Sequence, residues 1–215
     1  TYAAVVGQDK VFMKQIWKES GVPVVKFDWF FDNDYLKNPD KIIERLEKIG
    51  YPLIVKPARL GSSVGIKVCQ KQTLSVIEEV GSKNAFLTYE DKYISGAKGK
   101  SMGMASAKRI IPARIKESLA KEVSDVAIKA FRSLNSSGVV RIDFLIDSKN
   151  EKVYANEINS IPGSLSFYLW DKTDKTYEEL LDDVLNIGIR NYKNKMNKTH
   201  SFDTNILSNF SENGL

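Results

Sequence analysis

Residues 55–68 read VKPARLGSSVGIKV, and this stretch decides how the first half of the chain is interpreted. Apolar runs at its two ends, YPLIV and GIKV, predict the strands of a β-hairpin. The stretch also contains Pro57, two glycines and two serines, which favour a turn. Glycine N–H groups and serine hydroxyls suit the oxygens of a phosphate chain, and Lys56 adds a cation. The alternative is a flexible polar loop that holds no ligand.

The rest of the chain alternates helical and strand patterns. The spacing of apolar residues predicts helices over 10–20, 39–49, 116–134 and 177–192, and a strand over 22–27. Two further strands, 138–146 and 152–159, are joined by the turn-rich sequence DSKN and should form an antiparallel hairpin. The last residues, 194–215, are polar and aperiodic, so we expect a loosely packed tail.

Composition indicates an ordinary globular protein. Of the 215 residues, 42% are hydrophobic and 27% are charged. No apolar run reaches the roughly 20 residues of a membrane span, and the first residues, TYAAVVGQDK, lack the pattern of a signal peptide. The single cysteine, Cys69, cannot form an internal disulfide, which fits a reducing compartment. We therefore expect a cytoplasmic protein with no membrane partner.

Histidine content and charge narrow the chemistry further. The one histidine, His200, lies in the polar tail, which disfavours a histidine-activated nucleophile and a histidine-ligated zinc site. The net charge of +5 comes from scattered lysines, without the basic stripe and interleaved aromatic residues of a nucleic-acid-binding surface. This charge is either a solvated basic surface or includes a pocket for a polyanion such as a nucleotide.

The second predicted hairpin carries the candidate metal ligands. Side chains alternate along a strand, so Arg141 and Asp143 share one face, as do Glu157 and Asn159. When the strands pair, two carboxylates and an amide converge beside an arginine. Oxygen ligands with open positions for phosphate oxygens suit Mg²⁺. The alternative is an exposed strand face with ion pairs, but the glycine-rich hairpin in the same chain favours the metal.

Four motifs occur in the order KPARLGSSVGI, YEDKY, GVVRIDF and NEINSIPG. Together they resemble the ATP-grasp ligases, specifically the D-alanine–D-alanine ligases, over most of residues 1–190. The resemblance implies an α+β ATP-grasp fold in which two lobes with antiparallel sheets hold ATP between them. The implied divisions are a remnant of an N-terminal domain at 1–9, an incomplete central lobe at 10–80, a catalytic lobe at 81–193 and the polar tail at 194–215.

The resemblance also implies a role for each motif residue. Those implied to bind ATP are Lys10, Lys56, Ser62, Ser63, Val64, Gly65 and Lys92. Those implied to hold two Mg²⁺ ions, or Mn²⁺ in their place, are Asp143, Glu157 and Asn159. Those implied to act in catalysis are Ser62, Tyr93, Arg141 and Gly163, the last through its backbone N–H. Those implied to contact substrate are Arg141, Gly163, Tyr168 and Leu169.

The implied reaction joins two D-alanines through an acyl phosphate, with release of ADP and phosphate, for the peptidoglycan that builds the cell wall and sets cell shape. Ser160 and Ser164 stand where the family usually has threonines, and Tyr168 stands where a small hydroxyl residue usually binds the second substrate. The acceptor therefore stays open, with D-serine or D-lactate as alternatives to D-alanine. A non-catalytic nucleotide-binding module is a further alternative. The expected partners are small-molecule substrates and a second copy in a homodimer, with no nucleic acid.

We also expect a segment to be missing between Val68 and Ser75, in addition to the family's N-terminal domain. In the family, a helix, further strands and the adenine-contacting hinge separate the glycine-rich hairpin from the lysine–tyrosine motif. Those elements need several tens of residues, more than the interval from Val68 to Lys92 offers. CQKQ followed directly by TLSVIEEV, which has the pattern of a strand, indicates an abrupt junction.

Overall fold

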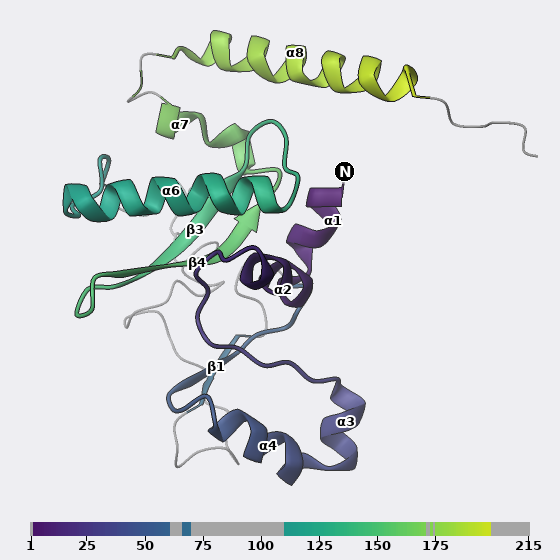
Figure 1. Ribbon diagram of the computed structural model, residues 1–215, viewed down its shortest axis with the longest axis vertical. Helices are drawn as coiled ribbons and strands as arrows, with labels where there is room; N and C mark the ends of the chain where they lie inside the picture. Colours follow the sequence, from purple (N-terminus) through teal and green to yellow (C-terminus); the bar gives the residue numbers. More distant parts are fainter. Residues whose placement is uncertain (1, 61–65, 70–109, 171–172, 174, 199–215) are drawn as a thin grey trace, which may run out of the picture.

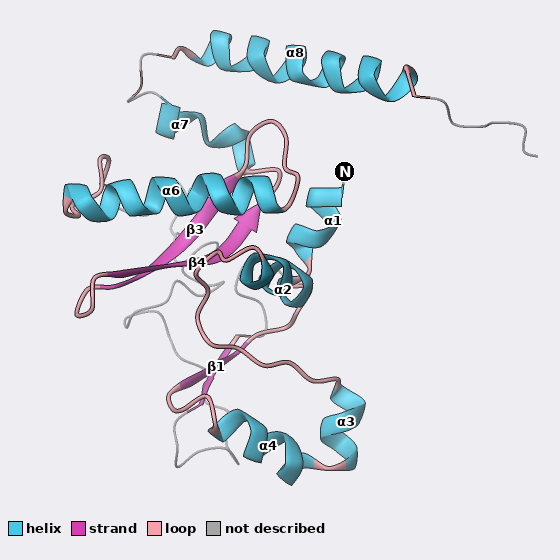
Figure 2. Cartoon of the chain, viewed as in Figure 1, coloured by secondary structure: helices cyan, strands magenta, loops and turns pink. Residues whose placement is uncertain are grey.

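The computed structural model of the protein describes residues 2–60, 66–69, 110–170, 173 and 175–198 (Figure 1). The elements in chain order are α1 (Tyr2–Gln8), α2 (Lys10–Glu19), α3 (Asp32–Lys37), α4 (Pro39–Glu47), β1 (Leu53–Val55), β2 (Lys67–Cys69), α6 (Glu117–Ser133), β3 (Arg141–Asp147), β4 (Lys152–Asn159), the 3₁₀ helix η2 (Gly163–Ser166), α7 (Phe167–Trp170) and α8 (Tyr177–Met196). The described strands form two separate antiparallel pairs, β1–β2 and β3–β4 (Figure 2). This mixture of helices and antiparallel sheets agrees with the expected α+β class.

Helix α2 begins and ends for reasons that are visible in the sequence. The Asp9 carboxylate accepts hydrogen bonds from the N–H groups of Val11 and Phe12 at 3.0 and 3.3 Å, and so caps the first turn. The helix ends before Gly21, whose φ of 67° lies in the left-handed region that glycine adopts without strain. The helix predicted over 10–20 is therefore confirmed.

The main hydrophobic core lies between α1, α2, α6 and the β3–β4 hairpin. Trp17 of α2 is fully buried, and its indole N–H donates to the backbone carbonyl of Ala130 on α6 at 3.3 Å. A Cβ on Gly7 of α1 would lie 2.9 Å from a side-chain carbon of Ile158, so α1 packs closely against β4. The buried members of this core are Ala3, Met13, Trp17, Val22, Val126, Ala130, Leu134, Ala155 and Ile158.

The first hairpin is confirmed as an antiparallel pair. Leu53 of β1 lies opposite Cys69 of β2, and both side chains are buried. The glycine-rich segment 61–65 that connects the two strands lies outside the described residues, as does the strand-like TLSVIEEV at 73–80. In Figure 1 this hairpin and helices α3 and α4 lie at the opposite end of the molecule from α8.

The other predicted helices are confirmed with small changes at their ends. The pattern over 39–49 forms α4, the pattern over 116–134 forms α6, and α8 extends four residues beyond the predicted end at Tyr192. The predicted pair of strands after α6 is confirmed as an antiparallel hairpin, although β3 begins at Arg141 rather than at 138. None of the helices in the described part of the chain is long and apolar enough to cross a membrane.

The prediction of a strand over residues 22–27 is wrong, because the structure has no strand there. This segment is irregular, and among the described residues it is joined to the second sheet by one backbone hydrogen bond, from the Ala155 N–H to the Pro23 carbonyl at 2.9 Å. Proline has no N–H with which to continue a ladder, so a single bond forms where a strand would need a series. Helices α1 and α3 were not predicted, because seven and six residues are too few to show a helical period.

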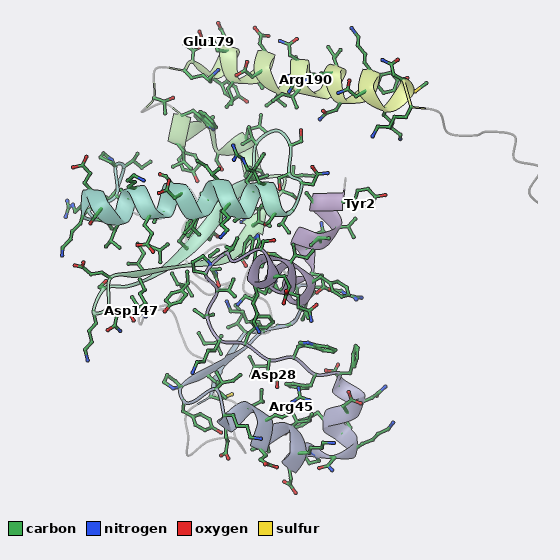
Figure 3. All side chains as sticks on the ribbon, in the orientation of Figure 1. Tyr2, Asp28, Arg45, Asp147, Glu179 and Arg190 are labelled. Atoms are coloured by element: carbon green, nitrogen blue, oxygen red, sulfur yellow. The ribbon has the colours of Figure 1, made fainter. Side chains whose placement is uncertain are left out.

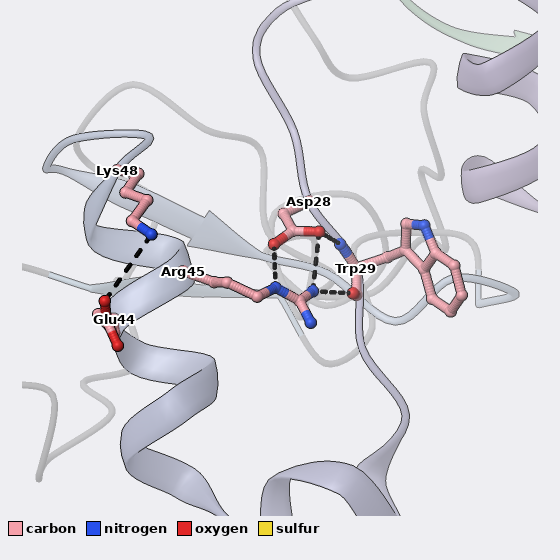
Figure 4. Close-up of polar contacts among 5 residues, drawn as sticks. All are labelled: Asp28, Trp29, Glu44, Arg45 and Lys48. Atoms are coloured by element: carbon pink, nitrogen blue, oxygen red, sulfur yellow. Dashed lines mark hydrogen bonds and ion pairs between the residues drawn. The ribbon is translucent and has the colours of Figure 1, made fainter.

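Asp28 ties the connector after α2 to helix α4 (Figure 4). The Nε and Nη2 atoms of Arg45 donate to the two oxygens of the Asp28 carboxylate at 2.8 and 2.9 Å, and Nη2 also donates to the Trp29 carbonyl at 2.7 Å. The hydrogen bonds from Arg45 are the main reason that the pKa of Asp28 is lowered. The same figure shows Glu44 and Lys48 of α4 as a looser pair, 3.8 Å apart.

We expect Asp28→Asn to lower the free energy of unfolding by less than about 1 kcal/mol at neutral pH, the range of exposed ion pairs. Because folding lowers the pKa of Asp28, the pair stabilises above the carboxyl group's ordinary pKa, and its contribution disappears as pH falls through the folded-state value. Urea unfolding at neutral and acid pH measures this, with Glu44→Gln as a control that should change nothing measurable. An equal loss at both pH values would contradict the ion-pair explanation.

Candidate functional site

The β3–β4 hairpin brings the four predicted polar residues onto one face. Arg141 lies directly opposite Asn159, and Asp143 lies directly opposite Glu157. Residues opposite each other in an antiparallel ladder point to the same side of the sheet. The convergence expected from strand alternation is therefore what the register provides.

A β-bulge explains why these side chains are not in the core. Asp143 pairs with Glu157 while Phe144 pairs with Ala155, so Asn156 is an extra residue on β4. The core side of β4 is Val153 and Ala155 before this residue and Ile158 after it. In a regular strand Glu157 would lie on the same face as Ala155, and the extra residue turns it to the other face.

Arg141 is paired with one of the carboxylates of this face. Its Nε and Nη2 atoms donate to the two oxygens of Asp143 at 2.9 and 3.3 Å. Burial alone would lower the pKa of Arg141, but the hydrogen bonds and charge of Asp143, together with Tyr168 and Glu157, raise it above its ordinary value. The guanidinium therefore stays charged, and Asp143 fixes its plane.

The amide of Asn159 indicates a missing ligand group. Its Nδ2 atom is buried and has no hydrogen-bond partner among the described residues. Buried polar atoms are almost always paired, so an unpaired one beside two carboxylates is evidence for a bound group at this position. In the described part of the chain no three His, Cys, Asp or Glu side chains could hold a metal by themselves. A metal held here would need the Asn159 amide oxygen and oxygens of a bound ligand, as the sequence implied.

Two predicted nucleotide-binding lysines lie beside this hairpin. The Lys10 ammonium donates to the Leu60 carbonyl at 2.7 Å, just before the glycine-rich segment, and its backbone N–H donates to the Ala58 carbonyl at 3.0 Å. The Lys56 ammonium lies 3.5 Å from the side-chain oxygen of Asn156, the bulge residue. The structure therefore brings Lys56 of the first hairpin to β4 of the second.

An ion pair joins the segment after β1, which carries Lys56, to the start of α2, which carries Lys10. Arg59 Nε donates to Asp9 Oδ2 at 2.9 Å, and the same carboxylate caps α2. Arg59 is therefore joined to the first turn of α2, from which Lys10 projects. This contact was not predicted, because the sequence does not show that residues 50 positions apart meet.

Lys14 is a further cation that the sequence did not single out. It lies on α2, one turn after Lys10, with its ammonium 5.6 Å from the centre of the Phe27 ring. Burial lowers its pKa to about 8; the positive charges of Lys56 and Lys10 act in the same direction, and Glu157 acts against them. These electrostatic contributions indicate that Lys14 lies near Lys10, Lys56 and Glu157. The spacing of four residues from Lys10 was the signal that could have identified it.

The segment after β4 has an unusual backbone. Ser164, Leu165 and Ser166 have φ values of 50°, 53° and 53°, a left-handed conformation that costs energy for residues other than glycine. Gly163 precedes them, and no atom of the described residues lies within 4 Å of the position that a Cβ on it would occupy. Tyr168 on α7 contributes to the pKa of Arg141, so it lies near the predicted site.

The remaining predicted site residues are less informative. Leu169 on α7 is 42% exposed, and its expected contact with substrate stays a prediction. Six predicted residues lie outside the described part of the chain: Ser62, Ser63, Val64, Gly65, Lys92 and Tyr93. The expected binding of ATP phosphates by the glycine-rich segment stays a prediction.

Solved structures share the fold of this chain. The D-alanine–D-alanine ligase from Coxiella burnetii matches with a TM-score of 0.66 and 21% identity, over 91% of this chain and 61% of that chain. The VanG D-Ala:D-Ser ligase from Enterococcus faecalis matches with a TM-score of 0.67 and 22% identity, over 87% of this chain and 63% of that chain. The fold is therefore the α+β ATP-grasp fold that the resemblance implied.

The family is shown by sequence. The family model described as D-ala D-ala ligase C-terminus matches residues 16–74 and 70–186. This chain belongs to the D-alanine–D-alanine ligase family, in the part that this C-terminal model describes. The D-alanine–D-alanine ligase of Thermosipho melanesiensis is 36% identical, over 96% of this chain and 63% of the relative. That of Thermoanaerobacter sp. (strain X514) is 33% identical, over 87% of this chain and 61% of the relative.

The alignments bear on the expected internal gap. The chain spans 63% and 61% of the length of these two relatives. The alignment to the Thermosipho melanesiensis protein extends over 245 positions, whereas 96% of 215 residues is about 206, so about 40 positions of the relative have no counterpart within the aligned region. The family model matches in two stretches that meet at 70–74, within the interval where the gap was expected. The spacing of Cα atoms there lies outside the described residues.

Proposed function

We propose that this chain forms the ATP-grasp part of a cytoplasmic enzyme that joins D-alanine to D-alanine for peptidoglycan precursors, using ATP. The observation that carries this proposal is the polar face of Arg141, Asp143, Glu157 and Asn159. A hairpin with only a structural role needs neither a bulge that turns Glu157 away from the core nor a buried, unpaired amide at Asn159. Both features suit a site that binds a ligand with oxygen-rich, charged groups.

Two groups of described residues would bind the metal and the ATP phosphates. Asp143, Glu157 and Asn159 would hold Mg²⁺, which when bound neutralises charge on the ATP phosphates. Lys10 and Lys56 would add positive charge beside the phosphate chain, and Lys14 supports them from α2. Phosphoryl transfer depends mainly on positioning and charge neutralisation, so preorganised cations and carboxylates are the expected groups.

Arg141 would act in the step that forms the peptide bond. The γ-phosphoryl group of ATP passes to the carboxylate of the first D-alanine, which leaves ADP and an acyl phosphate. The amine of the second D-alanine attacks the carbonyl carbon, and phosphate leaves as the tetrahedral species collapses. Asp143 engages Nε and Nη2 of Arg141, which orients Nη1 for donation to the developing oxyanion. The backbone N–H of Gly163 would donate to the same oxygen.

A different acceptor is the second candidate function. Tyr168 stands near Arg141, where the resemblance led us to expect a small hydroxyl residue for the second substrate. A tyrosine there changes the size and polarity of the acceptor position. D-Serine or D-lactate in place of the second D-alanine is therefore the alternative, and one of the matching solved structures is a D-Ala:D-Ser ligase.

One experiment tests both candidates. We expect ADP release that requires Mg²⁺ or Mn²⁺ and increases with D-alanine, measured beside D-serine and D-lactate as acceptors. Calorimetric titration with ATP and with inorganic tripolyphosphate then separates recognition of the phosphates from recognition of adenine. This matters because about 40 positions in the alignment to the Thermosipho melanesiensis protein lack a counterpart in this chain. Nucleotide binding without release of ADP under any of these conditions would favour a non-catalytic nucleotide-binding module.

A further inference from the structure

The start of α2 is joined to the segment after β1 by contacts of both backbone and side chains. The Arg59 Nε atom donates to the Asp9 carboxylate at 2.9 Å. The backbone N–H of Lys10 donates to the Ala58 carbonyl at 3.0 Å, and its ammonium donates to the Leu60 carbonyl at 2.7 Å. Three consecutive residues of this segment are therefore held against Asp9 and Lys10.

Asp9 is the side chain that links the helix to the ion pair. It is 8% exposed, and one carboxylate oxygen accepts from the N–H groups of Val11 and Phe12 while the other accepts from Arg59. Burial alone would raise the pKa of Asp9, but the hydrogen bond from Arg59 and those from the helix outweigh it and hold the pKa below its ordinary value. The carboxylate therefore stays charged at neutral pH, and each of its oxygens has a fixed partner.

The two segments joined in this way carry Lys10 and Lys56, both of which are expected to lie beside the ATP phosphates. Burial, and then the charges of Lys56 and Lys10, lower the pKa of Lys14, which indicates that both lysines lie near it. Like charges repel, so neighbouring lysines tend to move apart unless the backbone that carries them is fixed. Asp9 directly precedes Lys10. Arg59 lies three residues after Lys56, so the ion pair joins the backbone of both lysines.

We propose that Asp9 and Arg59 are positioning residues, whose ion pair holds the two lysines in place for the phosphate chain of ATP. Groups that are fixed before a ligand arrives lose less conformational freedom on binding, so the affinity is higher. Asp9 acts through the lysines, since a carboxylate by itself repels a phosphate chain. This inference rests on the proposed function, because it concerns the lysines that ATP would meet.

Asp9→Asn tests the inference by the sign of its effect. The one acceptor oxygen of asparagine can still cap α2, but its NH₂ group cannot accept from Arg59. If Asp9 had only an electrostatic effect, loss of its negative charge would strengthen the binding of an anion. Positioning predicts the opposite, and we expect the dissociation constants of ATP and inorganic tripolyphosphate, with Mg²⁺ present, to rise about tenfold in calorimetric titration. Unchanged or tighter binding would overturn the proposal.

Arg59→Gln and the double variant separate positioning from direct contact with the ligand. The Arg59 side chain is 78% exposed, so Arg59→Gln should leave the midpoint of thermal unfolding close to that of the unchanged chain. We expect it to weaken tripolyphosphate binding as much as Asp9→Asn does. The double variant should bind like either single variant, because the two residues act as one pair. If Arg59→Gln weakened binding further in the Asp9→Asn chain, Arg59 would contact phosphate itself and the positioning role would be refuted.

Arg45→Gln is the matched control. Arg45 forms a comparable ion pair with Asp28, and Figure 3 shows these two residues together beside α4. This pair joins the connector after α2 to α4, and neither segment carries a predicted nucleotide-binding lysine. Its loss should leave the affinity for tripolyphosphate unchanged. An equal loss of affinity in Arg45→Gln would mean that the effect does not depend on the segments that carry Lys10 and Lys56.

A measurement without ligand keeps this inference distinct from the proposed function. The Lys10 N–H donates to Ala58, whereas the Met13 N–H donates to the Asp9 carbonyl within the helix. In amide hydrogen exchange followed by NMR, we expect Arg59→Gln to accelerate exchange at Lys10 and to leave Met13 unchanged. Unchanged exchange at Lys10, in a chain that binds ATP and tripolyphosphate, would overturn this inference alone. No binding of either ligand by the unchanged chain would overturn the proposed function and this inference together.

Discussion

Glu157→Gln is expected to reduce Mg²⁺-dependent release of ADP by about 100-fold to 1,000-fold, the loss typical of removing one preorganised charge-stabilising group. The substitution keeps the shape of the side chain and removes the negative charge that would hold the metal. Glu157 faces away from the core on the far side of the bulge, so the midpoint of thermal unfolding should stay close to that of the unchanged chain. Steady-state kinetics over a range of Mg²⁺ concentrations measures the first effect, and calorimetry measures the second.

A binding measurement separates the metal from the rest of the reaction. Mg²⁺ should tighten ATP binding by the unchanged chain, and this effect should be lost in Glu157→Gln and reduced in Asp143→Asn. Glu151→Gln is the matched control, because Glu151 lies in the turn of the same hairpin and pairs with Lys116 rather than facing the site. Near-normal activity of Glu157→Gln across Mg²⁺ concentrations would show that the metal assignment is wrong.

The alternation of side chains along a strand predicted which residues share the site face. It did not predict which residues of β4 lie in the core. Period-two spacing placed Glu157 and Asn159 on one face of β4, and the register confirms that face. The same rule, continued back along the strand, would put Val153 and Ala155 on that face as well, although both are buried. The extra residue Asn156 resolves the conflict, and a one-residue bulge leaves no pattern in a single sequence.

Other differences from the predictions have local physical causes. The segment 22–27 contains Val22, Val24 and Val25, residues that favour strands, but Pro23 and the single backbone bond to β4 leave it irregular. Contacts of the lysines with residues distant in sequence were harder to predict. Lys56 reaches Asn156 across 100 positions of sequence, and only the resemblance to a known family had connected these segments.

We expect the charge of Lys14 to destabilise the folded state and to strengthen nucleotide binding. Its ammonium is partly buried and lies within the influence of Lys10 and Lys56, which together with burial lowers its pKa from 10.5 to about 8. A lowered pKa means that the folded state disfavours the charged form. We therefore expect Lys14→Met, which keeps the length of the side chain, to raise the free energy of unfolding at neutral pH by about 2 to 3 kcal/mol.

The stability difference between Lys14→Met and the unchanged chain should depend on pH. Below pH 8 Lys14 is protonated in both states, and the full cost of burying the charge is present. Between about pH 8 and 10.5 the unfolded chain binds more protons than the folded one, so the stability of the unchanged chain increases with pH in this window. The advantage of Lys14→Met should therefore be largest at neutral pH and should disappear above the ordinary lysine pKa.

The same substitution should weaken ATP binding at least about tenfold, because a charge-assisted contact to an anionic group contributes roughly 1.5 to 3 kcal/mol. A variant that is more stable yet binds less ligand is the result that a structural lysine would not give, since loss of a structural contact lowers both quantities. Urea unfolding across the pH window and calorimetric titration with ATP provide the two measurements. Lys18→Met is the control, one turn further along α2 and exposed to solvent, and it should change neither quantity. If Lys14→Met lowers stability at neutral pH, or leaves ATP affinity unchanged, the interpretation is wrong. Lys14 would then not be a buried charge that destabilises the fold and binds the ATP phosphates.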